Sequence, residues 1–296
     1  DAQQYIQYYI DAHNNGWINS GEGRSASDQN SARTGPFRIP VDFTDPVKRA
    51  ALGNGTDWQE VMFRTAPSHN AQLSVSGGTE KTQFLFSGNY LDQEAVLDQN
   101  YLKRLTLRSN IRQQVSEKFA VGLNLGVTGV YDRTEGTEGK SDVISLGLQS
   151  APIFPVYNEN GNLGFKDPNS EWYRFAQYTD LQLWHPYSLT RELQKQNKSF
   201  NTLGTAFAEY EVIEGLKFKT SINANLLNTR FNMFWNKDQK YGYSSALPAQ
   251  GNANSRFMLN WLSENTLNFS RQFGDHNLDA LLGYTVQKVG GECDYR

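Results

Sequence analysis

The run Phe-Ala-Val-Gly-Leu-Asn-Leu-Gly-Val-Thr-Gly-Val-Tyr, residues 119–131, alternates apolar side chains with small or polar ones. Every second residue from Val121 to Val127 is aliphatic, and successive side chains of a strand point to opposite faces. Phe119 and Tyr131 place an aromatic ring at each end of this apolar row, as in strands that cross lipid between two aromatic girdles. About twelve steps of ~3.3 Å, tilted by about 40°, span roughly 30 Å. The run therefore predicts a strand long enough to cross a membrane.

The same alternation recurs along the chain from Asn70 onward. The predicted strands cover residues 70–77, 82–91, 102–114, 119–131, 199–212, 216–228, 255–271 and 277–288. Turns of a few residues alternate with longer links, which lie at 92–101, 132–198 and 232–254. Short turns at one end of the strands and long loops at the other are typical of outer-membrane barrels.

Charged side chains within these strands are expected on the polar face alone. In residues 216–228, Lys217 and Lys219 alternate with Phe218 and an aliphatic row. An Arg or Lys at the middle of a bilayer costs about 2–4 kcal/mol, so lipid selects for this separation. A soluble antiparallel sheet with one wet face also alternates, but it leaves the aromatic strand ends and the sorted loops unexplained. The pattern favours an all-β fold, an antiparallel transmembrane β-barrel.

Residues 1–69 differ from the barrel strands of 70–296 and form an N-terminal segment that leads into them. Tyr5, Ile6, Tyr9 and Ile10 have helical spacing, which predicts a short amphipathic helix at 3–13. Residues 14–35 are rich in Gly, Ser, Asn and Asp and are predicted to be loop. A second short helix is expected after Thr56 or Asp57, since both can cap a helix N-terminus.

The composition excludes several classes of function. The chain has 296 residues and a formal net charge of -3, without the basic stripe that a nucleic-acid partner requires. No run approaches the ~18 apolar residues of a membrane-spanning helix. Cys293 is the one cysteine, so an internal disulfide is excluded. Asp1-Ala2-Gln3-Gln4 lacks a signal-peptide pattern, which for an exported protein predicts a mature form or an internal fragment.

No catalytic, cofactor or metal motif occurs, so the sequence predicts a protein that is not an enzyme. The four His residues are scattered, with none in a metal-ligand spacing. Glu209 and Glu211 could in principle serve glycoside hydrolysis, but their positions on a strand favour a lumen lining. Residues 158–161 and 167–169 offer oxygens to calcium, although Asn, Asp and Gly are first of all turn residues.

The long loops carry a concentration of aromatic side chains. Aromatic faces stack on sugar rings, and aromatic pockets anchor peptides. The alternative is that these rings pack the loops together or against a partner protein. The candidate ligand-binding residues are Trp172, Tyr173, Trp184, Tyr187, Trp235 and Tyr241.

A series of motifs occurs in a fixed order from residue 56 onward. It comprises Thr56-Asp57-Trp58-Gln59-Glu60 followed by Phe63-Arg64-Thr65, the hairpin 70–82, residues 88–94, the strands 102–110 and 121–125, and residues 155–162, 214–219, 264–269 and 281–284. In this order the motifs resemble the SusC/RagA family of TonB-linked outer-membrane transporters. The resemblance covers most of the chain, and the ordered series is specific where each piece alone is weak.

The resemblance implies an internal fragment of a larger outer-membrane barrel, whose plug and TonB-contacting segment lie elsewhere. It implies import of oligosaccharides or peptides across the bacterial outer membrane, driven through TonB and assisted by a SusD-like surface lipoprotein that acts as a lid. Loops 132–198 and 232–254 would then lie outside the cell, and the strands would contact outer-membrane lipid. Two alternatives stay open: a soluble glycan-binding β-sandwich, and a small structural outer-membrane barrel closed by eight strands.

Overall fold

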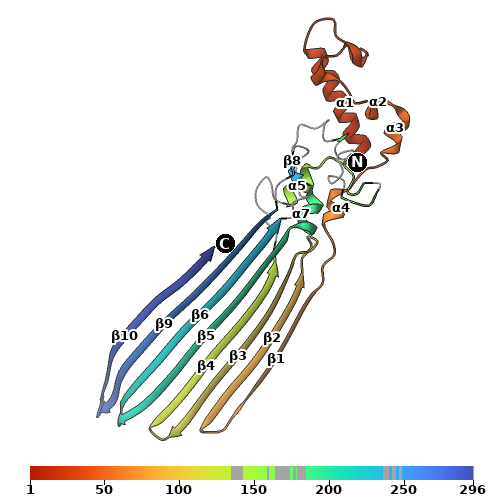
Figure 1. The fold of residues 1–296 in the computed structure, drawn as a ribbon. Coiled ribbons are helices and arrows are strands. Elements are labelled where there is room, and N and C mark those ends of the chain that lie inside the picture. Colours follow the sequence, from red (N-terminus) through yellow and green to blue (C-terminus); the bar gives the residue numbers. More distant parts are fainter. Residues whose placement is uncertain are drawn as a thin grey trace.

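The computed structural model describes residues 1–134, 143–158, 160–163, 174–175, 178, 185–235, 240–241, 245–246 and 249–295. Eight long strands form one antiparallel sheet in sequence order (Figure 1). They are β1 (Ser68–Gly78), β2 (Thr82–Glu94), β3 (Tyr101–Ser116), β4 (Phe119–Arg133), β5 (Gln194–Ile213), β6 (Leu216–Trp235), β9 (Gln250–Phe273) and β10 (His276–Tyr295). All eight predicted strands are therefore present.

The sheet register aligns the apolar faces of all eight strands. One continuous row of opposed residues runs Leu73, Gly88, Leu107, Val127, Thr202, Leu226, Leu259, Gly290. A row on the other face runs Gln83, Arg112, Gly122, Phe207, Ser221, Glu264, Thr285. A shift of one residue in any pairing would mix the two sets, so the register gives the sheet one apolar and one polar face.

Tight turns join the strands at the end of the sheet remote from the helices (Figure 1). Gly215 between β5 and β6 and Gly274 between β9 and β10 have positive φ, 81° and 59°. A Cβ added to Gly215 would also lie 2.5 Å from the carbonyl oxygen of Ser270. Glycine is therefore required at Gly215 both by its conformation and by the close approach of β9.

Several strands extend farther at the opposite end than the sequence predicted. The connection expected at 132–198 is shortened to 134–193, and the one expected at 232–254 to 236–249. The added strand residues are largely polar, so the apolar alternation that marks a strand is missing from them. The hydrogen-bond ladder continues there because it does not depend on side-chain polarity.

Within the predicted strand bounds, the expectation that charges lie only on the polar face is wrong at three positions. Lys103, Arg271 and Lys288 have the parity of the apolar residues in their strands. Each lies at or near an end of its predicted strand, where a long aliphatic stem can lie along apolar surface while the charge reaches water or headgroups. Lys103 is paired with Asp92 at 3.1 Å, and Arg271 with Glu214 at 3.7 Å.

Short helices gather at the long-connection end of the sheet (Figure 1). They are α1 (Ala2–Asn19), α2 (Val41–Thr44), α3 (Pro46–Ala51), α4 (Trp58–Met62), α5 (Val143–Gln149) and α7 (Pro186–Glu192), with 3-10 turns η1 (Asn30–Ala32) and η2 (Gly35–Phe37). The first helix, predicted at 3–13, continues through the start of the predicted loop to Asn19. Asp1 caps α1, and Asp57, one of the two expected residues, caps α4. Among the described residues no helix is long and apolar enough to cross a membrane.

Within the described residues, β1 and β10 each pair with a single neighbour. The predicted open edges are confirmed, and the alternative of a closed eight-stranded barrel is wrong. An open edge facing lipid would leave unpaired backbone groups that each cost several kcal/mol. The sheet therefore has the form of a wall segment that needs further strands on both sides.

Candidate binding site at the loop end of the sheet

The helices and the long β4–β5 connection form one body, here called the cap, from residues 1–63 and the described part of 143–193. Its core joins two distant parts of the sequence. The indole nitrogen of Trp58 donates to the carbonyl oxygen of Ala151 at 3.2 Å, and the Thr56 hydroxyl donates to that of Phe154 at 2.6 Å. The buried core residues are Ala2, Ile6, Ile39, Phe43, Trp58, Ala151, Ile153, Phe154, Leu163, Phe175 and Tyr187.

His185 lies in the interior of the cap, with 2% of its surface exposed. Its ring packs edge-on against Trp58 at 5.3 Å, and Nε2 is 3.2 Å from the carbonyl oxygen of Val156. Burial lowers the pKa of His185 to about 3, because the charged imidazolium loses its hydration. The side chain is therefore neutral at physiological pH and joins α7 to the segment that contains Val156.

Tyr187 is the one candidate ligand-binding residue whose side-chain contacts the structure describes. It is 8% exposed, meets Tyr157 edge-on at 6.0 Å and lies under the Arg191 guanidinium at 4.7 Å. Burial raises its pKa to about 12. These contacts give Tyr187 a packing role in the cap, and ligand contact for it stays a prediction.

The other candidates lie in or beside segments that the structure does not describe. Trp172, Tyr173 and Trp184 are outside the described residues. Trp235 ends β6 opposite Gln250, and Tyr241 belongs to a two-residue strand, β7 (Lys240–Tyr241), which pairs with β8 (Ser245–Ala246). Ligand contact by these five residues stays a prediction.

Residues 1–63 contribute a hollow that the sequence did not predict. It has a volume of about 590 Å³ and is lined by Tyr9, His13, Arg38, Tyr178 and a proline-rich turn. Tyr9 and His13 stack at 3.9 Å, while the Tyr178 hydroxyl donates to Asp42 at 2.8 Å. Burial, followed by that hydrogen bond, raises the pKa of Tyr178 to about 12. Aromatic faces beside a guanidinium can hold a sugar ring or the carboxylate of a peptide.

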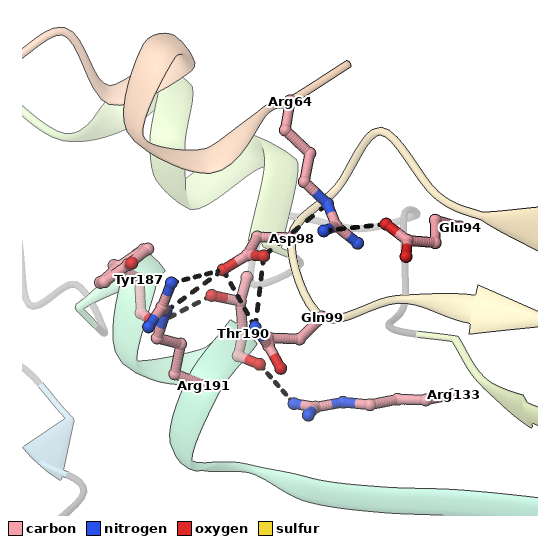
Figure 2. Close-up of polar contacts among 8 residues, drawn as sticks. All are labelled: Arg64, Glu94, Asp98, Gln99, Arg133, Tyr187, Thr190 and Arg191. Atoms are coloured by element: carbon pink, nitrogen blue, oxygen red, sulfur yellow. Dashed lines mark hydrogen bonds and ion pairs between the residues drawn. The ribbon is translucent and has the colours of Figure 1, made fainter. Parts of the chain in front are cut away.

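A polar network fastens the cap to the strands, and Figure 2 shows Asp98 at its centre between two arginines. Arg191 of α7 donates to the Asp98 carboxylate at 3.2 Å, and Arg64 lies 3.8 Å from it and 3.0 Å from Glu94. Arg133 at the end of β4 donates to the carbonyl oxygens of Thr190 and Leu193. The network therefore holds α7 against the β2–β3 connection and the end of β4.

We expect Asp98→Asn to loosen the cap while leaving the sheet intact. The Asp98 side chain is 13% exposed, and its neutralisation removes the carboxylate that joins Arg191 to Arg64, while Arg64 keeps its ion pair with Glu94 at 3.0 Å. The expected loss is about 1–3 kcal/mol of local stability, measured by hydrogen exchange at α7. Glu214→Gln is the control, because Glu214 is 86% exposed in its pair with Arg271 and such pairs contribute less than about 1 kcal/mol. Equal effects of the two substitutions would contradict the anchoring role of Asp98.

Among the described residues no group of His, Cys, Asp or Glu could hold a metal ion. The architecture is instead that of a wall segment from a large antiparallel outer-membrane barrel, with one apolar face, tight turns at one end and a folded cap at the other.

The comparisons define the family. No family model matches the sequence. TonB-dependent receptor P3 of Formosa agariphila is 32% identical over 244 residues, which are 80% of this chain and 23% of that receptor. TonB-dependent receptor P26 of the same organism is 26% identical over 80% of this chain and 22% of its own length.

Solved structures show the same fold. The RagAB peptide importer in its 'open-open' state matches 99% of this chain and 32% of that chain, with a TM-score of 0.68 and 18% identity. The RagAB peptide transporter matches 99% of this chain with a TM-score of 0.63 and 21% identity. The chain belongs to the family of TonB-dependent receptors, and its fold is that of the RagAB importer structures. It spans between a fifth and a quarter of the length of the curated relatives, which are named as receptors rather than as enzymes.

Proposed function

We propose that this chain forms part of the wall and the outer cap of a TonB-dependent importer in the bacterial outer membrane. Its apolar sheet face contacts lipid, its polar face lines the lumen, and the cap stands outside the cell. The substrates proposed are oligosaccharides or peptides, received under a SusD-like lipoprotein lid. TonB would act through a segment outside this sequence.

The observation that carries this proposal is a cap with its own core at the long-connection end of an open, two-faced sheet. The cap brings Tyr9, Arg38 and Tyr178 around a hollow and lies at the same end as the predicted loop aromatics. Binding residues are often found on loops that a rigid scaffold positions. The RagAB neighbours are a peptide importer, which supports peptides as one of the two substrate classes.

We expect the double substitution Trp184→Ala and Trp235→Ala in the full-length receptor to reduce substrate uptake about tenfold or more, since aromatic anchors carry a large share of binding energy. Uptake is measured per receptor in the membrane, together with recovery of the lid by co-purification. Phe273→Ala is the control, because this exposed ring lies at the turn end of the sheet. Loss of the lid with retained substrate affinity would assign the two residues to the partner interface. Unchanged uptake and lid recovery would remove them from the binding surface.

A further inference from the structure

Two cations lie on the apolar face near the loop end of the sheet. Lys198 of β5 is directly opposite Arg230 of β6, with Tyr131 of β4 on the other side of Lys198. Directly opposed residues of an antiparallel pair have Cβ atoms about 5 Å apart. Both cations are exposed, and they have the parity of the apolar residues in their strands.

Their depth follows from the strands themselves. Tyr210 and Phe218, also directly opposed on this face, mark the aromatic girdle at the turn end. Lys198 and Arg230 lie about twelve residues farther along the same two strands, which for strands tilted by about 40° is roughly 30 Å. Phe200, exposed and next on the same face, adds an aromatic ring just inside the pair. The two cations therefore stand at the level of the lipid headgroups.

Among the residues that the structure describes, neither cation has a carboxylate partner. Lys103, in the same register row, is paired with Asp92 at 3.1 Å, whereas Lys198 lies over the face of Tyr131, at 5.4 Å. Within the described part of the chain Arg230 has no carboxylate partner. Like charges directly opposed across a strand pair destabilise the sheet, so an anion shared between Lys198 and Arg230 would turn a repulsion into two attractions.

We infer that Lys198 and Arg230 form a site for the phosphate-bearing headgroup of a membrane lipid, with Tyr131 packing beside it. The guanidinium can hold two phosphate oxygens at once, and the ammonium adds a second charge. The acyl chains of the same lipid would run down the apolar face past Phe200. This inference rests on the proposed membrane placement of the sheet and is independent of substrate import.

The test compares two double variants of the full-length receptor, purified in detergent and shown to be folded. K198Q/R230Q removes the site. R104Q/R256Q removes two arginines from the polar face, one residue position away along the register, and is the matched control. Each protein is titrated with diphosphorylated lipid A, with dephosphorylated lipid A and with inorganic phosphate, and binding is read from the shift in melting temperature and by native mass spectrometry.

We expect lipid A to bind K198Q/R230Q about 25-fold more weakly than the wild type, since each cation near an anionic lipid contributes about fivefold. R104Q/R256Q should bind within about twofold of wild type, and the dephosphorylated lipid should bind all three proteins equally weakly. Equal loss in both double variants, or unchanged binding by K198Q/R230Q, would overturn the inference. Inorganic phosphate as effective as lipid A would show an ion site instead of a lipid site. Uptake by K198Q/R230Q, measured per inserted receptor, reports separately on the proposed function.

Discussion

Leu123→Arg should almost abolish assembly of the receptor in the outer membrane, while Asn124→Arg should be tolerated. Leu123 lies between Ile111 and Ala206 on the apolar face of β4 and is 42% exposed. An arginine there would turn an unpaired charge toward hydrocarbon, at a cost of about 2–4 kcal/mol near the middle of the bilayer. The measurement is the amount of folded receptor in isolated outer membranes.

Asn124 provides the matched control because it is the next residue of the same strand and is also exposed. It lies between Asn110 and Thr205 on the polar face, where an arginine would remain hydrated in the lumen. The two substitutions thus add the same side chain at the same depth and differ in the face that receives it. Similar amounts of assembled receptor for both variants would mean that the apolar face does not contact lipid.

The strands of the barrel wall could be predicted because every second residue of each strand faces lipid and is therefore mostly apolar. In residues 119–131 the apolar row, the polar row and the two terminal aromatics all encode the same orientation, and the register confirms it. The predicted strand bounds were too short at the loop end of the sheet, as in residues 194–198, which belong to β5. Beyond the apolar band both faces of a strand contact water, so the alternation of apolar and polar side chains no longer indicates which residues pair in the sheet.

The cap could not be predicted by the same reasoning, since its contacts join residues about a hundred positions apart. Thr56 and Trp58 were identified only as parts of a helix start and a motif, yet both bond to the segment 151–154. The sequence did contain one signal. Ala151-Pro152-Ile153-Phe154 is an apolar run within a polar loop, and such a run indicates residues that are buried in a core. Which partner it would meet depends on three-dimensional proximity that no local pattern encodes.

His185 makes the stability of this cap dependent on pH. The imidazole titrates near 6.5 when the segment unfolds, whereas burial lowers its pKa to about 3 in the folded cap. Between these values the unfolded state binds more protons, so stability falls as pH falls. The full stability contribution is present above about pH 6.5 and is lost progressively toward pH 3. The difference between the two pKa values, about 3.5 pH units, corresponds to roughly 5 kcal/mol, enough to open a small cap core before the strands.

We therefore expect limited proteolysis between pH 7 and pH 4 to cut the cap at increasing rates while the strands stay protected. His185→Gln is the test variant, since its amide can still donate to Val156 but does not titrate. It should lower cap stability at pH 7 through lost packing against Trp58, and it should make that stability nearly constant down to pH 4. If the wild type and His185→Gln lose protection over the same pH range, the imidazole is not the group that couples cap stability to pH.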